Sequence, residues 1–532
     1  MELIEPHFRS VNECPQEVEC QILGSLPEWL QGSLIRLGPG KWDLEDGFTL
    51  NHWLDGCAML IKFRFEDGRV FYSSKFLRSN AFTKMMAHGK PVFTEFGTRA
   101  YPDPSKPLVA RLINQLIPSD LTDNDISNIY LMNKRLFVAT ESCNIWRVDP
   151  ANMTGIEKFN LDREASVNLS TSHPLYSASD DSYYNVGTNF LSGMKYSIYR
   201  VPKREDSKSP SSNPFKGVKK IAVIPSRWKT GFSYIHSFAM TENFIIIIEQ
   251  PLVVNGFKLA TCTLKGKSME ECLEWRPDEP TRFYVINKST GKEQEFDFEY
   301  ETEAFFFFHV MNAYEQDGHA IIDLVAYEDI KVLEKYHLKY LRSNEFNDQC
   351  QPTARRYVLP LEKRVPQQNI KSQNNLVDLP NCSASAYLID GIIKLTYEQL
   401  AEPGFELPTL NDSFACTKYR YAYGSGTFEQ GTFSHSAIKL DLETHEVRMW
   451  KSSETAFPGE AFFIPKPDNQ GEDDGIILSA VLESDQSKKS FLILLDARTM
   501  MEMARILIPR DLAEIPPTIH GVFISNIKEI VI

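Results

Sequence analysis

Four of the eleven histidines in this sequence lie within or beside apolar segments. They occur in TSHPLY, YIHSFAM, FFHVMNAYE and TIHGVF, and they are His173, His236, His309 and His520. An imidazole in such a setting is either a structural histidine with one hydrogen bond to a backbone carbonyl, or a ligand to a transition metal. The spacings of 63, 73 and 211 residues form no local metal-binding motif. The four could share a metal only if the fold brings distant strands together.

His309 shows both alternatives, because it directly follows the run Phe305–Phe308. One interpretation places the four rings and the imidazole in the core. The other makes the run the wall of an apolar cavity into which His309 points as a metal ligand. Side chains alternate along a strand, so only about half of the four rings can face the same side.

Most of the chain has the composition of β-strands. Segments such as FIIIIEQ, FLILLDA, GIILSAVL and RFYVINK are rich in β-branched and aromatic residues, and long helical periodicity is scarce. Four β-hairpins recur in which an apolar strand ends at Asp or Asn and a Thr follows within five residues. Their turn residues are Asp149, Asn287, Asp441 and Asp496.

The hairpin separations of 138, 154 and 55 residues suit a repeating unit of roughly 55–77 residues, or about seven units. A four-stranded sheet repeated radially is the blade of a β-propeller, whose inner strands line a central axis where distant side chains meet. We therefore expect an all-β fold, a seven-bladed β-propeller that forms a single domain over residues 1–532. Any large antiparallel protein contains such hairpins, and the WD and kelch signatures are absent, so another antiparallel fold is the alternative.

Composition excludes several classes of protein. The formal net charge of -14 argues against a nucleic-acid binder, which needs a basic surface. Nine scattered cysteines without a CxxC pair indicate reduced thiols in a cytoplasmic protein. The first residues, MELIEPHFRS, do not resemble a signal peptide, and FIIIIEQPLVV, the longest apolar stretch, is too short and too polar to span a membrane. We expect a soluble protein that at most lies on a membrane.

The sequence resembles the carotenoid cleavage oxygenases, in the animal branch that also contains the retinal pigment epithelium isomerohydrolase. The resemblance covers nearly the whole chain. Its motifs here are GSLPEWLQGSLIRLGPGKW, NHWLDGCAMLIKF, FTEFGTRAYPDP, TDN, VATES, YIHSFAMTENFIIIIEQP, FFHVMNAYE, RRYVLPL, YAYG, EDDGIILSAVL and IHGVF. Chance does not explain so many motifs in the same order.

The resemblance implies a seven-bladed propeller with a helical and loop cap over a non-haem Fe(II) on the central axis, with O2 as co-substrate. The four histidines match the family's iron ligands. Glutamates that match its outer carboxylates are Glu141, Glu406 and Glu460, expected beside His236, His309 and His520 respectively. A carboxylate that accepts the second N–H of a ligating imidazole fixes the tautomer and makes the ligand more basic.

The resemblance also implies contact with a membrane, from which an insoluble polyene must be taken. The segment 107–117 places apolar residues at helical spacing, namely Leu108, Val109, Leu112, Ile113, Leu116 and Ile117. The segment 253–275 mixes apolar residues with lysines. An amphipathic helix that packs on the core is the alternative for the first segment. Ser105 stands where some relatives have a cysteine, so lipidation there is excluded.

Within the animal branch, the sequence is most similar to the insect enzymes that couple central 15,15′ cleavage to trans-to-cis isomerisation. Leu54 and Tyr327 depart from the isomerohydrolase. Residues that match tunnel positions are Phe96, Thr140, Tyr234, Phe308 and Tyr327. Eccentric 9′,10′ cleavage, retinyl-ester isomerohydrolysis and carotenoid binding without catalysis are the alternatives. A serine hydrolase is set aside because no GxSxG element occurs.

Overall fold

The computed structural model describes residues 4–105, 121–204, 213–293, 298–343, 345, 350–362, 374–426, 431–509 and 514–531. Over these residues the chain forms eight β-sheets and only short helices, so the all-β prediction is confirmed. The fold is that of a β-propeller. Seven sheets have four to six strands and one has three. The count of seven blades and the assignment of the whole chain to one domain stay predictions.

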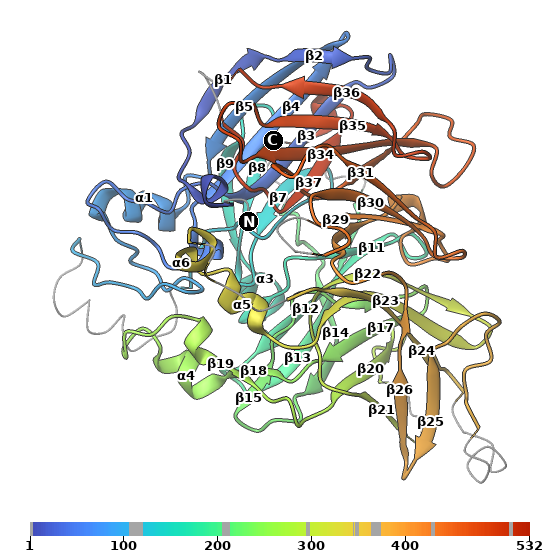
Figure 1. The fold of residues 1–532 in the computed structure, drawn as a ribbon. Coiled ribbons are helices and arrows are strands. Elements are labelled where there is room, and N and C mark those ends of the chain that lie inside the picture. The colour runs from blue at the N-terminus through green and yellow to red at the C-terminus, as the bar shows by residue number, and fades with distance from the viewer. Residues whose placement is uncertain are drawn as a thin grey trace.

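The two ends of the chain share sheets, which closes the molecule on itself. β3 (Gly32–Pro39) pairs with β37 (His520–Ile524), and β2 (Gln21–Gly24) pairs with β36 (Glu502–Leu507). In Figure 1 the early blue strands and the late red strands lie together at the top. The remaining strands of these two sheets are β1 (Cys14–Glu19), β4 (Ala58–Glu66), β5 (Arg69–Phe76), β32 (Ala456–Pro458), β33 (Phe462–Pro465), β34 (Gly475–Glu483) and β35 (Phe491–Asp496).

Three four-stranded sheets consist of strands that are consecutive or nearly consecutive in the chain. Each begins with an edge strand, from which the later strands pair outward in antiparallel order. Their strands are β6 (Asn128–Met132), β7 (Arg135–Ala139), β8 (Asn144–Asp149) and β9 (Thr154–Asn160); β22 (Phe306–Gln316), β23 (His319–Tyr327), β24 (Thr353–Pro360) and β27 (Glu398–Gln399); and β28 (Glu406–Thr409), β29 (Tyr421–Ser425), β30 (Ser436–Asp441) and β31 (Val447–Lys451).

Two larger sheets complete the set of seven. One contains β10 (Leu169–Ser170), β11 (Leu175–Ser177), β12 (Ser182–Asn189), β13 (Lys195–Pro202) and β14 (Lys219–Pro225). The other contains β16 (Ala239–Met240), β17 (Phe244–Glu249), β20 (Thr281–Asn287), β21 (Glu299–Thr302), β25 (Ser385–Ile389) and β26 (Ile392–Thr396). All six residues of β17 are buried, as its apolar sequence predicts. Its one charge, on Glu249, is paired with Arg227 at 3.1 Å.

Four of the helices and the three-stranded sheet lie on one side of the strands, and a cap over the centre stays a prediction. Figure 1 shows α1, α4, α5 and α6 gathered on one side of the strands, near β15, β18 and β19. No helix among the described residues has the length and hydropathy to cross a membrane. The bounds are β15 (Gly231–Ser233), β18 (Leu252–Asn255), β19 (Leu273–Trp275), α1 (Asn80–His88), α3 (Leu161–Ala165), α4 (Gly256–Thr261), α5 (Lys331–Lys335), α6 (Leu338–Leu341), and the 3-10 helices η1 (Glu5–Phe8), η2 (Trp53–Asp55), η3 (Glu270–Cys272), η4 (Asp412–Phe414) and η5 (Ile527–Glu529).

The four predicted hairpin turns follow β8, β20, β30 and β35. In each turn the Asp or Asn side chain accepts a hydrogen bond from a backbone N–H two or three residues later, at 2.8–3.1 Å. These side chains replace the strand hydrogen bonds that the turn interrupts. The turn residues that the sequence indicates are therefore confirmed as the ends of strands.

Candidate metal centre

Each of the seven larger sheets contributes one histidine or glutamate to a single cluster. These residues lie in or next to an edge strand, or in a loop between neighbouring strands. Glu141 lies between β7 and β8, His173 follows β10, His236 precedes β16, His309 lies in β22, Glu406 begins β28, Glu460 follows β32, and His520 begins β37. Radial repetition thus brings together side chains that are up to several hundred residues apart in the sequence.

The four histidines converge closely enough to hold one metal ion. Each offers one ring nitrogen, and the four nitrogens all lie within 4.8 Å of one another. The Nε2 atoms of His173 and His236 are 3.0 Å apart, and those of His309 and His520 are 3.2 Å apart. Two imidazole ligands at right angles, each about 2.1 Å from a metal, would have their nitrogens about 3 Å apart. The spacing therefore fits a metal centre.

Three of the histidines have a carboxylate at Nδ1. The distances are 2.7 Å from His236 to Glu141 Oε1, 2.8 Å from His309 to Glu406 Oε2, and 2.7 Å from His520 to Glu460 Oε1. These are the three pairs that the resemblance implies.

The tautomer of each paired histidine follows from its carboxylate. A carboxylate can only accept, so each imidazole carries its proton on Nδ1 and leaves Nε2 with a free lone pair. His309 and His520 consequently face each other with two unprotonated nitrogens at 3.2 Å. That arrangement is repulsive unless a cation lies between them, so the donor set fits a divalent transition metal.

The electrostatics of the cluster favour the same protonation states. Burial acts to raise the pKa of Glu141 and Glu406, but the adjacent imidazoles outweigh it and leave both pKa values below the usual range. Burial also acts to raise the pKa of Glu460, but Arg36 and His520 outweigh it, so this pKa too lies below its usual value. Burial lowers the pKa of His173 well below its usual value. Ionised carboxylates and a neutral imidazole are the states that metal binding requires.

His173 differs from the other three histidines. Its Nδ1 lies 3.3 Å from the side-chain amide nitrogen of Asn128, and that amide also donates to the carbonyl of Ser172 at 2.8 Å. The ring is therefore positioned by an amide and by the fold around it. The sequence contains no signal for this contact beyond the match of His173 to a ligand motif.

Two tyrosines and an arginine extend the cluster. The Tyr234 hydroxyl lies 3.2 Å from His236 Nδ1, and the Tyr327 hydroxyl donates to Glu406 Oε1 at 3.1 Å. Arg36 donates to Glu460 Oε2 at 2.9 Å. Of these three, Arg36 has no place among the predicted site residues, although a charge inside the apolar strand SLIRLGP is a signal that could have found it.

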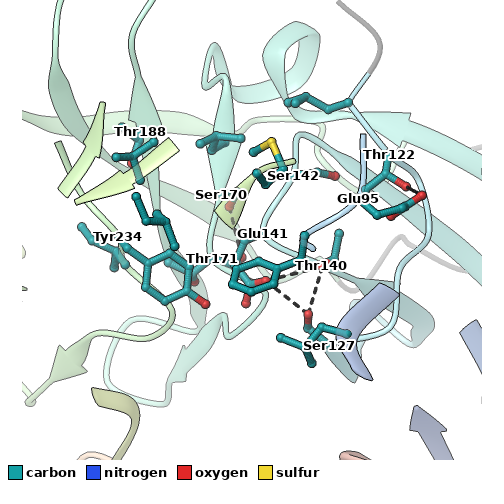
Figure 2. A pocket seen from close by; sticks show the side chains of 18 of the residues that line it. Glu95, Thr122, Ser127, Thr140, Glu141, Ser142, Ser170, Thr171, Thr188 and Tyr234 are labelled. Atoms are coloured by element: carbon teal, nitrogen blue, oxygen red, sulfur yellow. Dashed lines mark hydrogen bonds between the residues drawn. The ribbon is translucent and has the colours of Figure 1, made fainter. Parts of the chain in front are cut away.

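Two adjoining cavities, of about 130 Å³ and 90 Å³, lie beside the cluster. Leu54, Ser127, Glu141 and Tyr234 line both of them. Figure 2 shows the larger cavity, with Tyr234 at one end and Glu95 beside Thr122 at the other.

Four of the five predicted tunnel residues line one or both cavities. Phe96 and Thr140 line the larger cavity, Phe308 lines the smaller one together with two of the histidines, and Tyr234 lines both. Tyr327 is placed differently. Its ring packs against Phe308 with the centroids 6.1 Å apart, and its hydroxyl is engaged by Glu406.

The phenylalanine run serves both of the predicted purposes. Phe308 borders the cavity, and Phe306 packs on it with ring centroids 4.6 Å apart. Phe305 and Phe307 belong to the core, where Phe305 stacks on Tyr357 at 5.6 Å. The alternation of a strand separates the two pairs.

The predicted membrane segment 107–117, with Leu108, Val109, Leu112, Ile113, Leu116 and Ile117, lies outside the described residues. The second segment is described from β18 to β19. It carries Phe257 on α4, which is 71% exposed, and Leu264, which is 48% exposed. Phe257 lies on α4, and Leu264 lies in the turn after that helix.

Comparisons with known proteins agree over nearly the full length. A family model described as retinal pigment epithelial membrane protein (RPE65) matches residues 8–525. The β,β-carotene 15,15′-dioxygenase of Gallus gallus is 35% identical over 527 residues, with 97% of each chain covered. The mitochondrial carotenoid-cleaving dioxygenase of Mustela putorius furo is 36% identical over 542 residues, with 98% of this chain and 96% of the relative covered.

Solved structures with the same fold are more distant in sequence. The cobalt-substituted ACO of Synechocystis superposes with a TM-score of 0.74 at 22% identity, covering 98% of this chain and 99% of that one. A chimera of ACO and RPE65 gives a TM-score of 0.74 at 21% identity, with 98% of each chain covered. At this identity the two structures support the fold alone.

Proposed function

We propose that this chain, which belongs to the RPE65 (retinal pigment epithelial membrane protein) family, is a carotenoid dioxygenase that cleaves a forty-carbon carotenoid at the central 15,15′ double bond. The observation that carries the proposal is the convergence of four histidines, three of them with a carboxylate at Nδ1, beside two adjoining cavities. Relatives named as β,β-carotene 15,15′-dioxygenases support the choice of reaction.

Iron is the metal that the family implies, and Fe(II) held by the four histidines would supply the activation of O2. The imidazoles alone do not select iron, because the same set binds zinc or copper at least as tightly. The contribution of the chain is to fix His236, His309 and His520 so that each turns an unprotonated Nε2 toward the centre. Glu141, Glu406 and Glu460 provide this orientation from outside the histidines.

The cavity walls bind and orient the polyene. Phe96 and Phe308 present aromatic faces, which stabilise cationic character on a conjugated chain while it twists. Leu54 borders both cavities and therefore lies where a substrate would pass from one to the other. Burial of the substrate excludes water from the reacting bond.

Isomerisation coupled to cleavage is the finer part of the proposal. Its support is the similarity of the sequence to the insect enzymes, while the departures at Leu54 and Tyr327 argue against the isomerohydrolase. A side chain of different shape in the cavity wall beside the metal centre can hold one half of a polyene twisted while the other half stays extended. We therefore expect one all-trans and one 11-cis aldehyde per cleavage.

Peripheral contact with a membrane also belongs to the proposal. Phe257 and Leu264 are exposed near Lys258, Lys265 and Lys267, which suits an interface with anionic lipid. Co-sedimentation with phosphatidylserine vesicles tests this contact, and Phe257→Asp should weaken it. Equal sedimentation of both proteins would contradict it. A cytoplasmic location stays a prediction.

The test of the reaction is chromatography of the products that the iron-loaded protein forms from all-trans β-carotene or zeaxanthin in air. Equimolar all-trans and 11-cis retinal-type aldehydes are expected, and His309→Ala is the inactive control. Only all-trans central products would leave cleavage without isomerisation. Longer apocarotenals would indicate eccentric cleavage, which the similarity to the mitochondrial carotenoid-cleaving dioxygenases keeps as the second candidate. No aldehyde, with iron bound, would overturn the proposal and direct attention to retinyl esters.

A further inference from the structure

Arg36 is a fully buried charge on β3, the N-terminal strand that closes the molecule against β37. All three nitrogens of its guanidinium have partners. Nε donates to Thr518 Oγ1 at 2.8 Å, Nη1 to Glu460 Oε2 at 2.9 Å, and Nη2 to the carbonyl of Ile519 at 3.2 Å. A buried arginine with this many directed bonds holds its partners in one geometry.

The partners of Arg36 surround His520. Thr518 and Ile519 immediately precede it, and Glu460 accepts from His520 Nδ1 at 2.7 Å on the oxygen that Arg36 does not use. One carboxylate therefore joins the guanidinium to the imidazole. The backbone of β3 adds to this hold, because Ile519 N–H donates to the carbonyl of Leu37 at 2.7 Å.

Gly521, the residue after His520, makes room for this contact. A Cβ at position 521 would lie 3.0 Å from Arg36 Cγ and 3.1 Å from Nη1. Both distances are tighter than ordinary van der Waals contact, so a side chain at position 521 would press on the guanidinium. The short motif IHGVF thus combines a histidine with the space that the arginine behind it needs.

Glu460 is the only one of the three glutamates that is held by a cation in the described structure. Glu141 accepts from the hydroxyls of Ser127 and Ser172, at 3.2 Å and 3.3 Å. Glu406 accepts from the hydroxyl of Tyr327 at 3.1 Å. The outer support of the cluster is therefore asymmetric, and its one fixed positive charge lies on the side of His520.

That charge also balances the centre. Three carboxylates outnumber the two charges of a divalent cation by one, and an uncompensated charge in the interior is strongly destabilising. The guanidinium of Arg36 supplies the missing positive charge. Neutral histidines add none.

We propose that Arg36 is a positioning residue of the metal centre. It fixes the Glu460 carboxylate and the backbone before His520, so that His520 presents Nε2 to a divalent cation, and it neutralises the occupied centre. The inference rests on the metal centre of the proposed function and is independent of the substrate.

The test is titration of the metal-free full-length protein with Co(II), whose visible absorption reports affinity and coordination together. Wild-type protein is expected to bind one Co(II) per chain. Arg36→Gln should bind about 10- to 100-fold more weakly, the range found when outer partners of metal ligands are removed, and with a changed spectrum. The Co(II) affinity of Arg36→Lys should fall between those of the wild type and Arg36→Gln, because lysine keeps the charge and loses the planar guanidinium with its several donors. Gly521→Ala should weaken binding in the same direction.

The matched control is Arg356→Gln. Arg356 is a mostly buried arginine that donates to Asp323 at 2.8 Å and 2.9 Å, between β24 and β23. This variant should lower the thermal unfolding temperature but leave the Co(II) affinity and spectrum unchanged. Folded Arg36→Gln protein with wild-type affinity and spectrum would overturn the inference, as would the same loss in both arginine variants. If Arg36→Gln does not fold, Arg36→Lys decides by the same criteria. Wild-type protein that binds no Co(II) would instead overturn the metal centre itself.

Discussion

Four histidines can bind one cation only if each turns an unprotonated ring nitrogen toward it. In this protein carboxylates ensure this for three of them, since Glu141, Glu406 and Glu460 each place a proton on Nδ1 of their histidine. The unprotonated Nε2 atoms of His309 and His520 then meet at 3.2 Å. The carboxylates outside the histidines thus set the protonation and the orientation of the rings.

Glu406→Gln tests the role of one of these three carboxylates. Glu406 Oε2 accepts from His309 Nδ1, and Oε1 accepts from the Tyr327 hydroxyl. A glutamine keeps the shape but loses the charge, so the affinity for Co(II) should fall by about 10- to 100-fold in a metal titration. Tyr327→Phe is the control, because it removes one donor and leaves the acceptor of His309 in place. A smaller loss in Glu406→Gln than in Tyr327→Phe would contradict the assigned roles.

The sequence alone indicates part of this site. Four histidines in apolar strand segments stand out by type and setting. The glutamates do not, because ATES, FELP and FPGEAFF contain nothing that distinguishes a buried carboxylate from a surface one, and only the family resemblance selects them. Arg36 pairs with a residue 424 positions away. No pattern in a single sequence encodes such a contact.

At the scale of elements, the cavity wall depends on contacts between short segments of the cap. Asp55, at the end of η2, accepts from the backbone N–H of Gly97 at 2.7 Å and from the Thr98 hydroxyl at 2.5 Å. The carbonyl of Phe96 accepts from the N–H of Glu270 in η3 at 2.8 Å. Phe96 is therefore held from both sides, by two 3-10 helices that are far apart in the sequence.

Asp55→Asn probes this hold through pH. Burial raises the pKa of Asp55 to about 6, although the hydrogen bonds it accepts and the nearby His337 act to lower it. Because the folded-state pKa lies above the unfolded one, Asp55 contributes stability that is full below pH 4 and is lost as the pH rises through 6. The stability advantage of wild type over Asp55→Asn should shrink by about 3 kcal/mol between pH 4 and pH 7, measured by urea unfolding.

A constant difference between the two proteins over that pH range would contradict the assignment. Thr302→Val serves as the control, since the Thr302 hydroxyl donates to an uncharged partner, the backbone carbonyl of Leu395, at 2.9 Å in another sheet. Its stability difference from wild type should not follow the Asp55 titration.

The whole molecule is closed by its ends. β3 and β2 from the N-terminal region pair with β37 and β36 from the C-terminal region, and β37 begins with His520. The cluster is complete only when the last strand has been added. Hairpin turns and apolar strands predicted an all-β propeller from the sequence. The register of the closing strands could not be predicted, because it depends on pairing between segments nearly five hundred residues apart.

The proposed reaction requires one metal ion per chain, and an iron titration tests this requirement most directly. Metal-free protein is titrated anaerobically with Fe(II), then given β-carotene and air, and the retinal-type aldehyde is quantified at each step. The yield should rise linearly and break at one Fe(II) per chain, with no aldehyde at zero iron. Aldehyde formed without metal, or none at one equivalent of iron, would contradict the proposed reaction.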